Sequence, residues 1–137
     1  MDYQSRMNLQ PTRSRVRVLL LLALTVAIGI WSRMPRGGFP LHYKAVGDVL
    51  WATMFYLWVL LVAPRLSIFS VTGLTLAITF ATEFLKLCHA PWLDSLRNGR
   101  LAGFLLGHTF YWHDFASYIL GTFVAIAVDA GVLLRRR

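Results

Sequence analysis

The sequence predicts an all-α, multi-pass membrane protein with four transmembrane helices in a single membrane domain, residues 1–137. Hydrophobic residues make up 57% of the chain, against about 45–50% apolar residues in an ordinary soluble domain. Charged residues make up only 15%, against about 25%, and they divide the chain into long uncharged runs. This composition excludes a disordered chain, which combines low hydrophobicity with high charge. It also argues against a nucleic-acid-binding protein, despite the net charge of +8, because such proteins carry their bases on a soluble, folded face.

Four nearly uncharged runs are close to the length of a spanning helix. They are residues 18–32, 49–64, 66–82 and 115–134. A spanning helix needs about 20 mainly apolar residues, and charged side chains at its ends can extend to the membrane surface, so each helix can gain a turn from its flanks. None of the runs has the alternation of apolar and polar residues that is typical of a barrel strand. We therefore expect four helices, at about residues 16–33, 46–64, 66–88 and 113–134.

The connections between these helices are short except for the last one. Residues 64–65 make a very tight turn, so the second and third helices should form an antiparallel hairpin. Residues 33–40 are rich in proline and glycine and should form a loop. The last connection predicts a short helix that begins at Pro91, because proline is favoured in a first helical turn, and that ends before Gly99. Residues 101–110 are too short to cross a membrane and should form an interfacial or re-entrant segment before the last helix.

Basic residues indicate the orientation, because short cytoplasmic loops of membrane proteins are enriched in lysine and arginine. Eight bases fall on the side of the two termini and the 64–65 turn, and six fall on the other side. The arginine clusters at both termini strengthen this bias. We therefore expect both termini in the cytoplasm and the protein in a bacterial inner membrane. No Ala-x-Ala-like cleavage site follows the first apolar run, which favours a retained anchor over a cleaved signal peptide.

Polar residues gather at the outer end of this predicted bundle. Ionisable residues near the hydrocarbon are costly and usually paired, so each one suggests a functional site. Six bases and four acids at this end leave two positive charges in excess, and arginine can hold a phosphate or carboxylate with two parallel hydrogen bonds. Lys86, Arg97 and Arg100 would hold such an anion, and the acids would position these bases. The candidate ligand-binding residues are Asp48, Glu83, Lys86, Asp94, Arg97, Arg100 and Asp114.

A structural role for the same residues is the alternative. Threonines in membrane helices often serve as contacts between helices, and the third helix carries a polar face at steps of three or four: Thr72, Thr75, Thr79, Thr82, Glu83 and Lys86. The fourth helix carries a face of small residues at strict steps of four: Ser117, Gly121, Ala125 and Asp129. We expect these two faces to pack on each other or on a third helix. The acids could then simply tie the outer ends of the helices together. In this alternative, the acids Asp48, Glu83 and Asp114 pair with the bases Lys86, Arg33 and Arg97.

The sequence indicates no cofactor, no metal site and no catalytic centre. No pair of histidines has a recognised metal-ligand spacing; the four are His42, His89, His108 and His113. No phosphate loop or nucleophile elbow is present. Glu83 could act as a general base, but no second catalytic residue accompanies it, so we expect a protein that is not an enzyme. The one cysteine, Cys88, excludes an intramolecular disulfide and is expected to be a small buried side chain.

Four blocks of the chain carry a resemblance to a known family. They are Gly47-Asp48-x-Leu50-Trp51-Ala52, then Glu83, then Ala90-Pro91-Trp92-Leu93-Asp94-x-x-Arg97, and finally Leu106-Gly107-x-x-Phe110-x-Trp112-x-Asp114-x-x-x-Tyr118-x-x-Gly121. They resemble the bacterial membrane family named domain of unknown function 2809 (DUF2809), over about residues 16–134. The layout is more loosely similar to the VanZ-like proteins. Lys86 stands where we expect that first family to carry a glutamine, so an ion pair with Glu83 would replace a neutral hydrogen bond.

The leading functional hypothesis is a non-enzymatic inner-membrane protein whose outer polar cluster binds an anionic or amphiphilic, lipid-type ligand, such as a lipid-linked envelope precursor. The alternative is an accessory or assembly subunit of a larger membrane complex, in which the same cluster is structural and the glycine and threonine faces contact a partner. Stoichiometric co-purification with other chains would favour the subunit. The expected partners are the lipid bilayer and other membrane subunits, and not nucleic acid.

Overall fold

The computed structural model describes residues 13–32 and 40–133, apart from the side chains of residues 40–43, 104 and 105. The predicted loop at 33–40, including Arg33, lies almost wholly outside the described residues, and so do the arginines at 135–137. Every regular element in the described part of the chain is helical. The elements are α2 (Arg15–Ser32), α3 (Pro40–Val62), α4 (Ile68–Leu85), α5 (Pro91–Arg97), α6 (Arg100–Leu106), α7 (Trp112–Val128) and the π-helical turn η1 (Asp129–Leu133).

Four helices are long and apolar enough to cross a membrane, as the sequence predicts. The candidate spans are Arg15–Ser32, Lys44–Val62, Ile68–Leu85 and Trp112–Leu133, the last of which combines α7 and η1. The fold is therefore that of a multi-pass, all-α membrane protein. The short helix predicted after Pro91 is α5. The segment predicted not to cross is largely α6, which has only 7 residues and so spans about 10 Å, far less than a hydrocarbon core of about 30 Å.

Two helix ends differ from the prediction by three residues or more, and the local sequence and hydrogen bonding explain them. α3 begins at Pro40 rather than at 46, because a proline at the first helical position is pre-organised for the helix. α4 ends at Leu85 rather than at 88, because the next three backbone N–H groups donate to the carbonyls three residues earlier, at 3.0–3.1 Å, which tightens the last turn. At its other end, α4 is capped by Ser67, whose hydroxyl accepts from the N–H of Ser70 at 3.2 Å.

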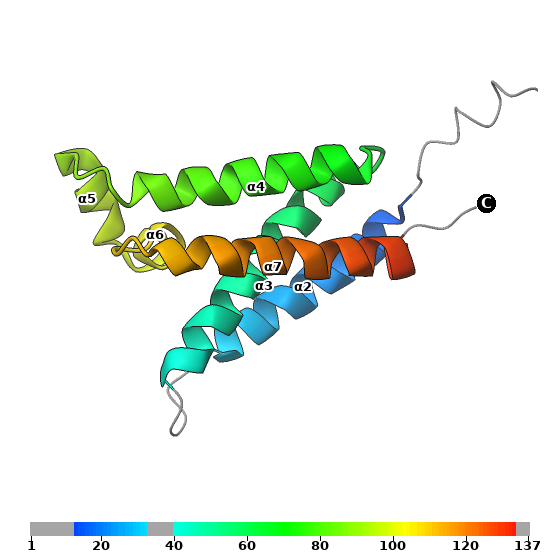
Figure 1. Ribbon diagram of the computed structural model, residues 1–137, viewed down its shortest axis with the longest axis horizontal. Coiled ribbons are helices and arrows are strands. Elements are labelled where there is room, and N and C mark those ends of the chain that lie inside the picture. The colour runs from blue at the N-terminus through cyan, green and yellow to red at the C-terminus, as the bar shows by residue number, and fades with distance from the viewer. Residues whose placement is uncertain (1–12, 33–39, 134–137) are drawn as a thin grey trace, which may run out of the picture.

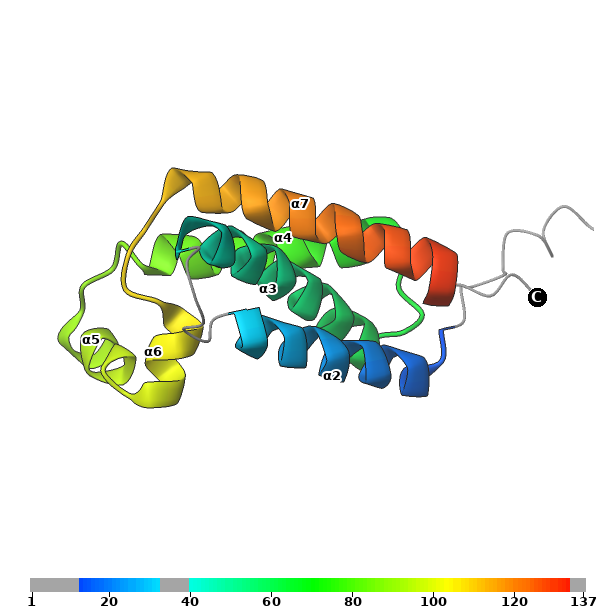
Figure 2. The same ribbon diagram turned by 90° about the horizontal axis from the view of Figure 1, so that it is seen from below.

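α3 is the central helix of the bundle. It packs against α2, α4 and α7, whereas α2 packs chiefly on α3. Figures 1 and 2 show α4 and α7 side by side, and both views place α5 and α6 at the end of the bundle opposite the red end of α7, where η1 lies. We call the end where α4 finishes and α7 begins the Glu83 end. The opposite end, where α2 begins and η1 finishes, is the Arg13 end.

The small-residue face of α7 packs on a third helix, as expected. A Cβ added at Gly121 would collide with the carbonyl of Val49 and lie 2.9 Å from the Cβ of Ala52, both on α3. The Thr53 hydroxyl of α3 donates to the Gly121 carbonyl at 3.0 Å, so small side chains allow the two backbones to approach closely.

The threonine face of α4 is also buried, with Thr75 and Thr79 fully inaccessible. Their hydroxyls, however, donate to carbonyls of α4 itself, at 2.8 Å and 2.9 Å, so they contribute packing rather than hydrogen bonds between helices. The prediction that Cys88 is buried is wrong: it is exposed, because α4 has already ended and its side chain lies in the turn after the helix.

Candidate functional site

Glu83 accepts three hydrogen bonds at the Glu83 end. It lies in the last turn of α4 and is fully buried. Its Oε2 atom accepts hydrogen bonds from Lys86 Nζ at 2.6 Å and from the Tyr118 hydroxyl of α7 at 2.7 Å. Its Oε1 atom accepts from the backbone N–H of Tyr111 at 3.2 Å. The predicted Glu83–Lys86 ion pair is therefore confirmed, and the same carboxylate also fastens α4 to α7 and to the loop before it.

Two lysines link Glu83 to two further carboxylates. Lys44, near the start of α3, donates to Asp114 Oδ1 at 2.5 Å and to Asp48 Oδ2 at 3.2 Å. Lys86 Nζ lies 3.6 Å from Asp114 Oδ2, so each lysine stands between two acids. We call these five residues, Lys44, Asp48, Glu83, Lys86 and Asp114, the Glu83 cluster. It ties together the ends of α3, α4 and α7.

The acids of the Glu83 cluster are buried, whereas its bases reach the surface. The side chains of Glu83 and Asp114 are 0% exposed and that of Asp48 is 9% exposed. The Lys86 side chain is 12% exposed and that of Lys44 is 43% exposed. Lys44 Nζ also lies 4.6 Å from the ring centroid of Tyr111, a cation–π contact that helps to fix its position. The cluster thus presents its positive groups toward the surface. The more exposed of the two, Lys44, is the first residue of a candidate span.

The turn after α6 runs directly over Lys86. Gly107 has a φ of 63°, a left-handed conformation that favours glycine. A Cβ at this position would lie 3.1 Å from Lys86 Cε. The glycine therefore allows the chain to turn from α6 toward α7 while covering the lysine stem.

Arg97 and Asp94, which the sequence placed in the anion site, lie in α5 and are used internally. The Arg97 side chain is 3% exposed and donates to Asp94 Oδ1 at 2.9 Å. It also donates to the carbonyl of Cys88 at 2.8 Å and to that of Leu85. Carbonyls at the end of a helix lack partners within the helix, so Arg97 closes the end of α4. Arg97 therefore joins α5 to the end of α4.

Arg100, the third predicted anion ligand, begins α6 and is exposed. It has no hydrogen bond or ion pair within residues 13–32 and 40–133. The structure thus brings together Asp48, Glu83, Lys86 and Asp114 of the predicted set, and leaves Asp94, Arg97 and Arg100 outside that network. Binding of an anion by any of them stays a prediction.

Lys44 belongs to the site but was not predicted from the sequence. Its spacing of four residues before Asp48 was a usable signal, because residues four apart share a helix face. The acceptor role of Glu83 toward Tyr118 and the Tyr111 N–H was not predicted either. No three His, Cys, Asp or Glu side chains are arranged to hold a metal in the part of the chain that the structure describes.

A second buried network, also missed, lies at the Arg13 end. Arg13 donates from Nε to Asp129 Oδ1 at 2.5 Å and from Nη2 to Asp129 Oδ2 at 2.7 Å. The Tyr56 hydroxyl donates to the same carboxylate at 2.8 Å. Arg13 Nη1 donates to the carbonyls of Pro64 and Leu66 at 3.0 Å and 2.7 Å. We call Arg13, Tyr56 and Asp129 the Arg13 cluster.

With this geometry established, comparison with known families identifies the chain's relatives. The profile of a family described as "Protein of unknown function (DUF2809)" matches residues 41–122, which is more than half of the 137 residues. The chain belongs to this family. The DUF2809 match covers all five members of the Glu83 cluster, whereas Arg13 and Asp129 lie outside it. No solved structure matches the chain. The looser similarity to VanZ-like proteins stays a prediction.

Proposed function

We propose that this DUF2809 protein is a non-enzymatic membrane protein whose Glu83 cluster binds the anionic headgroup of an amphiphile at the membrane surface. The observation that carries the proposal is the difference in exposure within the cluster, where the acids are buried and Lys44 is 43% exposed. A base held between two buried carboxylates is already ordered, so less conformational entropy is lost when a ligand binds.

The residues have distinct roles in this proposal. Lys44 meets the anion with its exposed ammonium group. The cluster has three carboxylates and two lysines, and in this proposal the exposed Arg100 at the start of α6 offsets the remaining negative charge. Glu83 and Asp114 hold the two lysines. Arg97, which closes the end of α4, positions α5 and so takes a structural part rather than the ligand-binding part expected from the sequence.

A paired replacement separates ligand binding from helix fastening. Lys44→Met together with Asp114→Asn removes both members of the shorter ion pair of Lys44, which is often near neutral for stability, while Asp48 loses its longer contact with Lys44, at 3.2 Å. The probe is tritiated farnesyl phosphate, an isoprenoid with one phosphate, and unlabelled farnesol is the uncharged competitor. We expect the immobilised, detergent-solubilised wild-type protein to bind the probe and the double variant to bind it at least about tenfold more weakly, with a similar thermal midpoint.

Two controls complete this experiment. Lys44→Arg keeps the charge and both ion pairs, so it should retain most of the binding. Arg17→Gln removes one charge at the opposite end of the bundle and should leave Lys44-dependent binding unchanged. Wild-type affinity in the double variant, or displacement of the probe by farnesol, would show that the Glu83 cluster is a fastening between helices and nothing more.

We further propose that the protein lies in a bacterial inner membrane with both termini in the cytoplasm, so that the Glu83 end faces outward. The distribution of eight bases against six supports this orientation. The Arg13–Asp129 contact supports an even number of spans, because it joins the start of α2 to the end of α7. Reporter fusions after Arg137 and inside residues 33–46 should report opposite compartments. A periplasmic signal from the reporter after Arg137 would contradict this topology and indicate the reverse orientation.

A further inference from the structure

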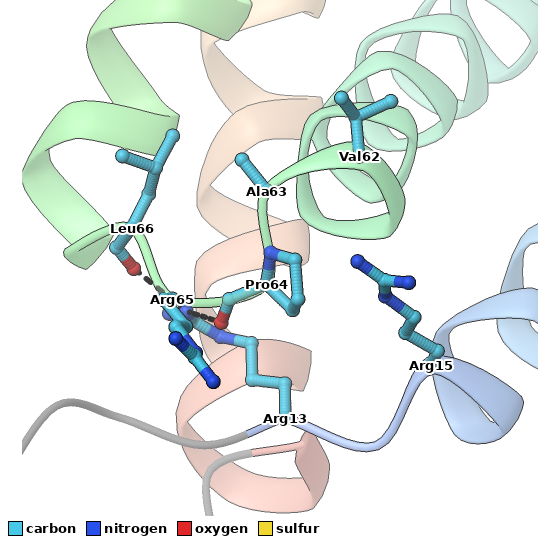
Figure 3. A pocket seen from close by; sticks show the side chains of 7 residues that line it. All are labelled: Arg13, Arg15, Val62, Ala63, Pro64, Arg65 and Leu66. Atoms are coloured by element: carbon cyan, nitrogen blue, oxygen red, sulfur yellow. Dashed lines mark hydrogen bonds between the residues drawn. The ribbon is translucent and has the colours of Figure 1, made fainter.

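A hollow of about 830 Å³ opens at the Arg13 end, between the start of α2 and the connection from α3 to α4 (Figure 3). Its lining combines arginines with apolar side chains. The lining residues are Arg13, Arg15, Val62, Ala63, Pro64, Arg65 and Leu66. It is therefore a positively charged hollow with an apolar wall, at the opposite end from the Glu83 cluster and with no residue in common with it.

Among the described residues that line this hollow, two arginines carry positive charge that is available to a ligand. Arg13 is fully occupied by Asp129 and by the carbonyls of the α3–α4 connection, so its charge is neutralised and it forms part of the wall. Arg15 and Arg65 are exposed, and neither has a carboxylate partner within residues 13–32 and 40–133. Figure 3 shows Arg15 extending from α2 toward the connection, with Pro64 between it and Arg65.

The position of the hollow matches the level of lipid headgroups. It lies where one candidate span ends at Val62 and the next begins at Ile68, so its opening lies at a membrane surface. Val62, one of the apolar lining residues, is 72% exposed. A ligand that suits both halves of this lining has a negative phosphate for the guanidinium groups and a hydrocarbon chain for the apolar wall.

We propose that this hollow binds one anionic phospholipid, whose phosphate-bearing headgroup lies between Arg15 and Arg65 and whose acyl chain follows Val62. Guanidinium groups suit a phosphate because they can donate two parallel hydrogen bonds to it. Arginines at a membrane surface also attract anionic lipids without a defined site. A defined site differs from that general attraction in two measurable ways: its stoichiometry, and its dependence on the two arginines that line the hollow.

The test measures equilibrium binding of tritiated phosphatidylglycerol to the immobilised, detergent-solubilised full chain. We expect one tightly bound lipid per chain, not displaced by excess phosphatidylcholine or by millimolar inorganic phosphate. Arg15→Gln and Arg65→Gln should each weaken binding about five- to tenfold. Arg17→Gln is the matched control, because Arg17 lies on the same helix at the same end but does not line the hollow. It should change the affinity by less than about twofold.

Three results would overturn the proposal. Equal weakening by Arg17→Gln and by the two lining variants would indicate general attraction to a basic surface. Unchanged binding in both lining variants would exclude the hollow as the site. Displacement by inorganic phosphate would indicate a site for a free anion rather than for a lipid. Because Arg15 and Arg65 are exposed, both variants should fold, and an unchanged thermal midpoint verifies this.

Discussion

The two ends of the bundle neutralise buried carboxylates with different bases. At the Arg13 end, one arginine meets one aspartate, and both side chains are 0% exposed. At the Glu83 end, two lysines are shared among three carboxylates, and the lysines remain partly accessible. An arginine fork matches a carboxylate in two parallel bonds, whereas a lysine is a compact point charge on a flexible stem. The arginine–aspartate pair suits a rigid contact between helices, whereas the partly accessible lysines can bind a further partner.

The largest expected effect is at the Arg13 end. Arg13→Met would leave Asp129 buried without its counter-charge, which typically costs about 3–5 kcal/mol of unfolding free energy. Arg13→Met with Asp129→Leu should recover most of this loss, because no charge then remains buried. Unfolding in mixed micelles by titration with dodecyl sulfate measures both. If Arg13→Met were as stable as the wild type, the Arg13–Asp129 ion pair would contribute little to the stability of the fold.

Lys86→Met makes the corresponding change at the Glu83 end. It should lower the free energy of unfolding by a smaller amount, about 1.5–3 kcal/mol. Glu83 keeps two hydrogen bonds in this variant, from Tyr118 and from the Tyr111 N–H, so its charge is not left without donors. Glu83→Gln with Lys86→Met should be close to wild type in the same titration. A loss as large as that of Arg13→Met would contradict the distinction between the two ends.

Gly121→Ala tests the contact that lies between the two ends. The added Cβ would push α7 away from Val49 of α3, and such overpacking typically costs about 1–3 kcal/mol. Gly73→Ala is the matched control, since a Cβ at Gly73 on α4 meets nothing within 4 Å. Near-ultraviolet circular dichroism and the same unfolding titration should detect the first change and not the second.

The smallest effect is expected for Arg100→Ala, whose exposed side chain has no partner among the described residues. The unfolding free energy of the Arg100→Ala variant should stay within about 0.5 kcal/mol of the wild-type value. Arg97→Ala is the informative contrast, because it removes donors from the carbonyls of Leu85 and Cys88. Equal stability of the two variants would mean that closure of the α4 end does not depend on Arg97.

The sequence was enough to predict the helices, because their signal is local. Uncharged runs between charges predicted all four spans, and Pro91 predicted the start of α5. The Glu83–Lys86 pair was also predictable, since both residues lie on one helix three positions apart. These features depend on neighbours along the chain, whose relative positions a helix fixes.

The long-range partners could not be predicted in the same way. Asp129 stood out as the only charge in the last apolar run, yet nothing local connects it to Arg13. Arg97 illustrates the opposite error, because an arginine in a loop looks available for a ligand until the fold brings helix-end carbonyls within its reach. Which base serves which acid depends on how the helices are stacked, and the hydrophobic pattern alone does not determine that.

The Arg13–Asp129 contact can form only late in synthesis, after both residues have been made. The two residues are 116 positions apart, so Arg13 has left the ribosome long before its carboxylate exists. At about 5–20 residues per second, that interval is on the order of ten seconds. During it, the first three spanning helices can insert and pair, but the arginine that will close the bundle has only the carbonyls of Pro64 and Leu66, water and lipid phosphates as partners. A chain truncated before Asp129 would retain those three helices and lack the closing contact.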